Sequence, residues 1–499
     1  MTLASRLGAL LLAFCPALAG CTVMGPDFIA PTADTPQTFA AAVPGGKRSV
    51  PVAEPVDPQW WKILGDPVLT RLEERLSEGN LDLKAAATRL AQARAQLGFV
   101  SAARLPISNA NASITRDQQS REGVLAISSS NSATNANGVG GRTSSRNSRI
   151  FEPYDLFQYG FDVSWEVDLW GRVARLIETS TAQLEATIEA RREIEVTASA
   201  ELARDYVLLR GAQRKLAITR ENLDIARRSH GLTRERAAGG LTTDLDVANA
   251  AAISEAIAAQ LPALEARQAE LGNAIALLLG GQPGALTVEL AAPRGVPAVP
   301  PRVPVGVPSE LARRRPDIRR AEAMLHAATA DIGVATADFY PRFMLSGSGA
   351  IQGLELRNLV DWRAHTYAFG PSVSLPIFDG GRVRRTLELR EAQQQEAAIV
   401  WQRTLLGALH DVDNALTAYD AEQRRRDRLE ASARESRRAL GIARQRYEQG
   451  VADFLQVLVA QRALLAAEQD LSDSTTAIST NLVQLYKSLG GGWSAAAAP

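Results

Sequence analysis

The clearest pattern of apolar and polar positions lies at residues 157–169, where the two kinds of residue alternate without a break. Because successive side chains of a strand point to opposite faces, the odd-numbered residues predict an apolar, aromatic face and the even-numbered residues a polar face. The run is about twice as long as a usual strand and long enough for the roughly 9–11 residues that cross a bilayer. A half-buried strand of a soluble protein gives the same alternation, so the remaining sequence has to decide between the two.

The chain contains two copies of one structural unit. Gly171-Arg172-Val173 recurs 210 residues later as Gly381-Arg382-Val383, and the same offset relates Gly240 to Gly450. Earlier in each copy the offset is 235, so the first copy holds an insertion. Residues 128–149 are rich in Ser, Asn and Gly, the composition of a surface loop, and account for that insertion.

Each copy shows the same order of predicted elements: a helix, a strand, a loop, a strand, a very long helix, a turn and a further helix. Repeat 1 is expected at 66–284, a Pro-rich linker at 285–308, repeat 2 at 309–490, and a flexible C-terminal tail at 491–499. The predicted strands lie at about 105–114, 156–170, 340–352 and 365–379, and the long helices at 172–238, 242–280, 382–449 and 452–489.

The longest helical patterns are those at 172–238 and 382–449, neither of which contains a proline. At ~1.5 Å per residue each would be about 100 Å long, far beyond a helix of a globular domain. Apolar residues recur every seven positions, for example at Leu202, Leu209 and Leu216. Sustained sevens favour coiled-coil packing against neighbouring helices, with a solvated spectrin-like rod as the alternative.

The N-terminus has the features of an export signal. An apolar run follows Arg6 and is too short for a spanning helix, so residues 1–20 are expected to be a cleaved signal peptide. Leu18-Ala19-Gly20-Cys21 resembles the lipobox of bacterial lipoproteins, in which the Cys becomes the acylated first residue. Thr22 follows it, rather than the Asp that retains such lipoproteins in the inner membrane, so the resemblance points to the outer membrane. Residues 21–65 would then form a lipidated, Pro-rich, extended tether; an ordinary signal that happens to contain a Cys is the alternative.

Composition excludes several classes of function. The chain has 55 basic and 55 acidic residues among 499, so net charge gives no electrostatic case for binding nucleic acid. The four His are scattered, and with Cys15 removed and Cys21 lipidated no thiol remains for a metal or disulfide site. No group of residues has the spacing of a catalytic or metal site, so we expect neither an enzyme nor a cofactor other than the lipid on Cys21.

Four alternating strands cannot form a membrane structure alone. An open sheet would leave unpaired backbone groups in hydrocarbon, so a membrane sheet must close, and known barrels begin at about eight strands. The chain would therefore supply part of a barrel shared by two to four subunits, and the pattern does not choose among these numbers.

Several motifs together resemble the TolC/OprM family of outer-membrane efflux channels, in its lipoprotein (NodT-like) branch. They are the lipobox, Trp60-Trp61 with Asp66-Pro67, the run Arg314–Arg319, and Tyr447-x-x-Gly450 followed by Leu455-x-Val457-Leu458. The resemblance implies a fold class of long α-helices plus a membrane β-barrel, with a homotrimer forming one twelve-stranded barrel and an α-helical periplasmic tunnel. It implies three partners: a periplasmic membrane-fusion adaptor, an inner-membrane RND-type pump and outer-membrane lipid. The function would be passive export of small molecules, such as drugs or toxic compounds.

The resemblance also implies roles for residues at two helix tips, 237–243 and 448–453, where the tunnel would be gated. The implied aperture residues are Leu455 and Val459, with Asp246 and Asn249 at the same positions in repeat 1. Many relatives carry an acid where this chain has Val459, so an apolar constriction is expected here. Tyr447 would hold neighbouring helices together in the closed state, and the adaptor would dock on Gly240, Gly450 and Asp453. Ordinary coiled-coil packing is the alternative for Leu455 and Val459.

Two other classes of function stay open. One is a type I secretion or metal-cation efflux channel of the same fold, and the scarcity of Met (four residues) makes a metal cargo the weaker option. The other is a structural coiled-coil lipoprotein of the outer membrane. That second class leaves the alternating strands and the loop at 128–149 without an explanation.

Overall fold

The computed structural model describes residues 23–33, 35–40, 49–118, 120 and 152–493. The chain divides into two compact units, each assembled from both sequence repeats. The strand unit contains residues 1–28, 95–181 and 327–394, and the helical unit contains residues 29–94, 182–326 and 395–499.

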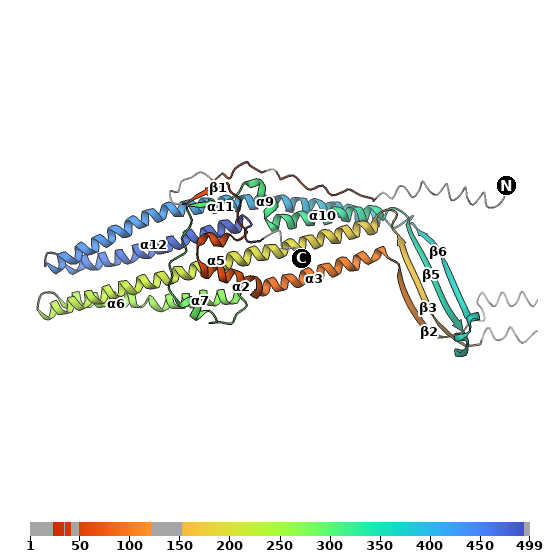
Figure 1. The fold of residues 1–499 in the computed structure, drawn as a ribbon, viewed down its shortest axis with the longest axis horizontal. Coiled ribbons are helices and arrows are strands. Elements are labelled where there is room, and N and C mark those ends of the chain that lie inside the picture. Colours follow the sequence, from red (N-terminus) through yellow and green to blue (C-terminus); the bar gives the residue numbers. More distant parts are fainter. Residues whose placement is uncertain (1–22, 34, 41–48, 119, 121–151, 494–499) are drawn as a thin grey trace, which may run out of the picture. The chain divides into compact units, whose positions relative to one another are not determined.

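The strand unit holds one antiparallel sheet of four long strands (Figure 1). In sheet order they are β2 (Ile107–Asp117), β3 (Tyr154–Val167), β5 (Arg342–Gly353) and β6 (His365–Ser374). The sheet joins the two repeats, because β3 of the first pairs with β5 of the second. In the described sheet β2 and β6 each have one unpaired edge. β6 ends short of its expected limit of 379, because Pro376 has no N–H with which to continue the ladder.

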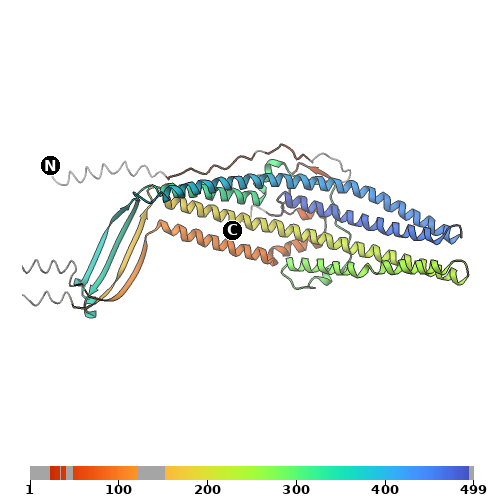
Figure 2. The ribbon, with the colours of Figure 1, turned by 180° about the vertical axis from the view of Figure 1, so that it is seen from behind.

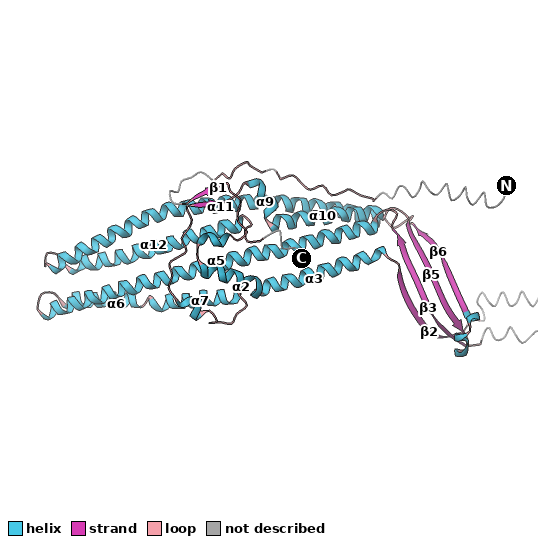
Figure 3. Ribbon diagram, viewed as in Figure 1, coloured by secondary structure: helices cyan, strands magenta, loops and turns pink. Residues whose placement is uncertain are grey.

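Helices make up most of the described chain (Figure 3). The longest are α5 (Arg172–Ala238) and α11 (Arg382–Glu448), with 67 residues each. They turn back into α6 (Asp244–Ala258) and α12 (Phe454–Ser488), forming two hairpins that lie side by side in opposite views (Figures 1 and 2). The other elements are β1 (Val50–Val52), η2 (Trp60–Leu64), α2 (Pro67–Gly79), α3 (Leu81–Ser101), η3 (Ala102–Arg104), α7 (Leu261–Leu278), α8 (Thr287–Ala291), β4 (Arg302–Pro304), α9 (Pro308–Arg314), α10 (Pro316–Ala337), η5 (Leu356–Val360) and η6 (Trp362–Ala364).

The helix expected at 242–280 is interrupted in the structure. α6 ends at Ala258 and α7 begins at Leu261, with Pro262 in its first turn. A proline has no N–H and its ring clashes with the carbonyl four residues earlier, which accounts for the break. Repeat 2 has no proline in the corresponding stretch, so α12 runs on without interruption. Among the described residues, Asp244–Leu278 is long and apolar enough to cross a membrane by length and composition, with 22% of its apolar window buried.

The core of the helical unit contains the apolar residues that recur every seven positions along α5. Leu202, Leu209 and Leu216 are at most 6% exposed, which agrees with coiled-coil packing rather than a solvated rod. The Trp60-Trp61 motif also lies here: Trp60 is 2% exposed and stacks on Tyr486 of α12 with 5.2 Å between ring centroids. Asp66 accepts hydrogen bonds from the N–H groups of the first turn of α2 and from the Tyr206 hydroxyl (2.6 Å), so this motif fastens α2 to α5.

The Pro-rich tether and the C-terminal tail differ from expectation, because both are packed where the structure describes them. β1 pairs in parallel with β4 of the linker, and Phe39 and Val56 are each 6% exposed. Prolines restrict φ but do not prevent burial of neighbouring apolar side chains, so a Pro-rich segment can still pack against the helices. In the tail, the Trp493 ring lies under the guanidinium group of Arg192, 4.6 Å from the ring centroid.

A buried carboxyl on α2 predicts a pH-dependent stability. Burial raises the pKa of Glu73 well above its usual value, although Ser199 nearby acts in the opposite direction. Because burial disfavours the charged carboxylate, Glu73 lowers the free energy of unfolding only where the unfolded chain would release the proton. Below the unfolded-state pKa of about 4.3 there is therefore no cost. The cost then grows as the pH rises, until the folded-state pKa is passed.

We therefore expect Glu73→Gln to raise the melting temperature at pH 7–8 and to change it little near pH 4. Thermal unfolding of the detergent-solubilised protein at several pH values would measure this. Glu78→Gln, at an exposed position on the same helix, is the matched control. A Glu73→Gln protein whose melting temperature follows that of the wild type at every pH would contradict the argument.

Candidate functional site: the helix tips and a two-faced sheet

Both helix tips are closed by the same backbone motif. Gly240 donates its N–H to Ala237 O (2.9 Å) and Gly450 donates to Tyr447 O (3.0 Å), with φ values of +70° and +75°. The following residue in each tip bonds back to the helix as well, which completes a glycine-ended helix cap. A Cβ at either glycine would meet nothing within 4 Å, so a positive φ rather than crowding requires glycine here. At both tips the glycine backbone is therefore not covered by any described side chain of the same protomer.

The predicted aperture residues of repeat 2 are exposed apolar side chains in the protomer. Leu455 is 64% exposed and Val459 is 61% exposed, and their spacing of four places them on one face of α12. The 210-residue offset makes Leu245, rather than Asp246, the counterpart of Leu455 in repeat 1, and Leu245 is 68% exposed. Leu241 and Val451 within the turns are exposed too. Clustered exposed apolar groups at both tips indicate a surface that contacts something other than bulk water.

The predicted aperture residues of repeat 1 lie differently. Asp246 closes a capping box with Thr243 and also accepts a hydrogen bond from the Thr242 hydroxyl (2.6 Å). That bond is the main reason why the pKa of Asp246 lies below its usual value. Asn249 is half-buried on the same helix, and Asp453 stands at the N-cap of α12 without a side-chain capping bond. The Asp246 carboxylate is thus held by its own turn within the protomer.

Tyr447 joins the two hairpins of one protomer. Its ring is 5% exposed and packs on Phe454 of its own hairpin, with 5.1 Å between centroids. The guanidinium of Arg236, at the end of α5, lies 4.7 Å from the ring centroid and donates to the carbonyls of Tyr447 (3.0 Å) and Glu448 (3.3 Å). Arg236 was not identified from the sequence. A cation in the last turn of a helix is a known signal, but this chain has too many arginines for that signal to stand out.

The sheet of the strand unit has two faces of different chemistry. On one face Phe161 lies opposite Gly349, which in turn lies opposite Tyr367. Along β6, the rings of Tyr367 and Phe369 stack with 6.4 Å between centroids and are 70% and 82% exposed. On the other face Asp162 lies opposite Asn109 and Ser348. The alternation at 157–169 is therefore an apolar face with exposed aromatic rings and a polar face of Ser, Asn, Gln and Asp.

The first described residues are fixed to the start of α5. Met24 N donates to Trp170 O (3.0 Å), and the Arg175 guanidinium donates to Met24 O (3.1 Å) and to the Asp27 carboxylate (2.7 Å). Gly25 lies so close to α10 that a Cβ there would come within 2.4 Å of a backbone atom of Gly333. The predicted lipidation site, Cys21, lies outside the described residues.

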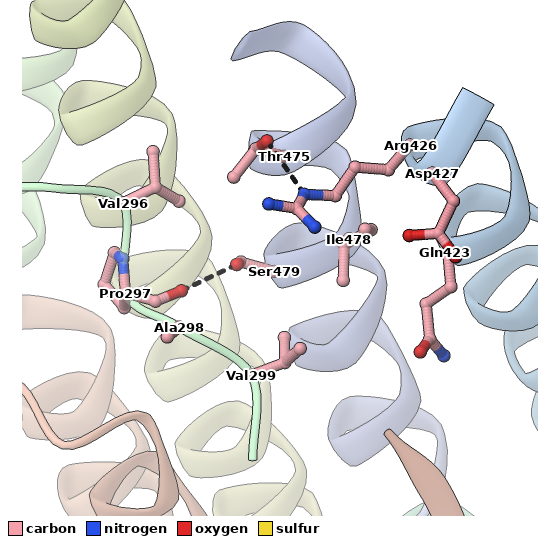
Figure 4. A pocket seen from close by; sticks show the side chains of 10 residues that line it. All are labelled: Val296, Pro297, Ala298, Val299, Gln423, Arg426, Asp427, Thr475, Ile478 and Ser479. Atoms are coloured by element: carbon pink, nitrogen blue, oxygen red, sulfur yellow. Dashed lines mark hydrogen bonds between the residues drawn. The ribbon is translucent and has the colours of Figure 1, made fainter. Parts of the chain in front are cut away.

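A cavity of about 350 Å³ in the helical unit lies where the linker crosses α11 and α12 (Figure 4). Its lining residues are Val296, Pro297, Ala298, Val299, Gln423, Arg426, Asp427, Thr475, Ile478 and Ser479. Ser479 Oγ donates to Pro297 O (2.8 Å), and Arg426 Nε donates to Thr475 Oγ1 (3.3 Å). The first bond fastens the linker to α12 and the second joins α11 to α12. The cavity is therefore the place where the linker packs against these helices.

Comparison with known proteins gives consistent matches along nearly the whole chain. A family model described as "Outer membrane efflux protein" matches residues 72–281 and 307–491. The chain is 33% identical over 475 residues to "Outer membrane protein OprJ" of Pseudomonas aeruginosa, covering 95% of this chain and 94% of that protein. It is 31% identical over 484 residues to "Toluene efflux pump outer membrane protein TtgI" of Pseudomonas putida, covering 96% of each. The solved structure of the outer-membrane channel OprN superimposes with a TM-score of 0.84 at 35% identity, covering 94% of this chain and 99% of that one.

Proposed function

Because this chain belongs to the outer membrane efflux protein family, we propose that three copies of it form the passive outer-membrane conduit of a tripartite efflux pump. The chain is an outer-membrane efflux component and not an enzyme, since nearly its whole length matches channels of this kind. The proposal concerns how many copies assemble, where the conduit closes, what it carries and what it binds.

The sheet requires more than one copy, and the likeness of this chain to channels of its family sets the number at three. Each chain contributes four strands with unpaired edges at β2 and β6, and such edges must be paired inside a membrane. Three copies give twelve strands in one closed barrel, with the apolar face of the sheet toward lipid and its polar face toward a wet lumen. The apolar stretch Asp244–Leu278, mostly exposed in the protomer, would pack against helices of neighbouring copies in the periplasmic tunnel.

The conduit would close at the helix tips. Three copies of Leu455 and Val459, both largely exposed in one protomer, would meet around the tunnel axis as an apolar constriction. Asp246 and Asn249 would line the same level from repeat 1. Tyr447, held beneath Arg236, would keep the two hairpins of each copy together in the closed state.

The constriction is tested by replacing its apolar side chains with a smaller polar one. We expect the double substitution Leu455→Ser with Val459→Ser to raise single-channel conductance several-fold in planar bilayers, because the aperture becomes both wider and easier to wet. Val288→Ser, which changes an exposed apolar residue of α8, is the matched control. A double variant with the conductance of the wild type would overturn the assignment of the gate.

The partners would bind at the tips and in the outer membrane. A periplasmic adaptor would dock on Gly240, Gly450 and Asp453; at the two glycines a Cβ would meet nothing within 4 Å in the protomer, which leaves room for a partner. An inner-membrane RND-type pump would supply the energy. A lipid on Cys21 would enter the outer membrane, and the fastening of the residues that follow it to α5 supports an anchor at that end of the chain.

The cargo would be small molecules. The relative TtgI is named for a toluene efflux pump, which supports apolar compounds of that size. A metal cation is the alternative cargo. Export assays with a solvent and with a cation in cells lacking this chain would distinguish them.

A further inference from the structure

The polar face of the sheet carries one charged residue midway along its strands. On that face β3 presents Gln158, Asp162, Ser164 and Glu166, alternating with the aromatic residues of the other face. Asp162 lies opposite Asn109 of β2 and Ser348 of β5, away from both ends of the sheet. Its neighbours across the strands are therefore uncharged.

The other charged groups of this face in the described strands lie at its two ends. Glu166 forms an ion pair with Arg172 (2.6 Å), and Arg342 forms one with Asp338 (2.5 Å), both where the strands adjoin helices. Asp117 lies at the opposite end of β2 and accepts a hydrogen bond from Thr115 (3.1 Å). No lysine or arginine of the described strands faces Asp162 from β2, β5 or β6.

The surroundings of Asp162 hold its carboxylate in place without neutralising its charge. The side-chain amide of Asn109 donates to one carboxylate oxygen (3.1 Å), and the amide of Asn111 donates to the other. Amide groups orient a carboxylate through their N–H donors, but they carry no compensating charge. Asp162 is only half-buried, and its carboxylate is therefore still exposed on the polar face of the sheet.

We infer that Asp162 makes the channel selective for cations. The inference rests on the proposed trimer, in which the polar face lines the lumen and three copies of Asp162 form a ring of negative charge. A ring of one sign of charge concentrates counter-ions in the lumen and repels ions of the same sign. Cationic and neutral cargo would pass this level more readily than anionic cargo.

The test is the reversal potential of single channels in a KCl gradient. Both arms use the Leu455→Ser, Val459→Ser background, so that the strand region rather than the tip controls the ion flow. At about 0.01 M salt the Debye length is roughly 30 Å, and there we expect Asp162→Asn to lower the K⁺/Cl⁻ permeability ratio roughly threefold toward unity. At about 1 M salt the Debye length is roughly 3 Å, and the difference should vanish.

Asp155→Asn is the matched control. It removes the same charge from β3, but on the apolar face, where Asp155 forms an ion pair with Arg116 (3.3 Å). The control should keep the permeability ratio of the background channel. If Asp162→Asn keeps that ratio too, or if both variants lower it equally, Asp162 does not set selectivity. A background channel that conducts no ions would instead overturn the proposed conduit, and the inference with it.

Discussion

Replacing Arg236 by alanine is expected to shift the channel from closed to open. Arg236 lies over the Tyr447 ring and donates to two carbonyls at the end of α11, so it adds a polar contact between the two hairpin tips of one protomer to their shared apolar cluster. A hydrogen bond from a charged group contributes about 1.5–3 kcal/mol. If opening breaks this contact, about 2 kcal/mol changes the open-to-closed ratio by about thirtyfold for each protomer in which the contact is lost. Open probability in planar bilayers is the measurement.

Two variants separate this contact from other causes. Arg234→Ala removes an exposed arginine two residues earlier on the same helix, so a similar opening in that variant would attribute the effect to lost charge. Tyr447→Phe keeps the ring beneath Arg236 and removes a hydroxyl that is buried without a hydrogen-bond partner in the described chain. A leaky Tyr447→Phe channel would mean that the hydroxyl, in addition to the ring, stabilises the closed state.

The second large effect is expected at Gly211, where α5 of repeat 1 touches α12 of repeat 2. A Cβ built on Gly211 would lie 2.5 Å from the Thr476 hydroxyl and 2.7 Å from its methyl group. Thr476 is buried and its hydroxyl bonds Ser472 O (2.9 Å), so it has little room to move. Overpacking of this kind costs about 1–3 kcal/mol. We expect Gly211→Ala to lower the melting temperature, although alanine normally stabilises a helix.

The control for Gly211 has the opposite expected sign. Gly231 lies on the same helix, and a Cβ there would meet nothing within 4 Å. Gly231→Ala should therefore gain the usual helix propensity of about 0.5–1 kcal/mol. Thermal unfolding of both variants in detergent is the measurement. A Gly211→Ala protein as stable as Gly231→Ala would contradict the close approach of the two helices.

The regular parts of the fold followed from the sequence because strict periodicity has one simple structural solution. Alternation at 157–169 predicted β3 with an apolar and a polar face, and the sevens from Leu202 onward lie buried in the helical core. The constant offset between the two repeats predicted the order of elements in the second copy from that in the first. Membership of the efflux channel family, predicted from motifs spread over the chain, is confirmed by the family model and by relatives at 33% and 31% identity.

The irregular parts could not be predicted because they depend on contacts between distant residues. The packing of β1 on β4 joins segments about 250 residues apart, and nothing local in either segment indicates the pairing. Arg236 and Tyr447 likewise belong to different repeats. The break before Pro262 is different, because proline alone predicts it. The roles of Leu455, Val459, Asp246 and Asn249 stay predictions, since they depend on neighbouring copies of the chain.

The central claim is that three copies of this chain close one channel, and the mass of the detergent-extracted particle tests it most directly. A protein mass of three chains, each of at most 53.5 kDa, is the predicted result. A monomeric particle would leave β2 and β6 with unpaired edges in the membrane, and would contradict the claim.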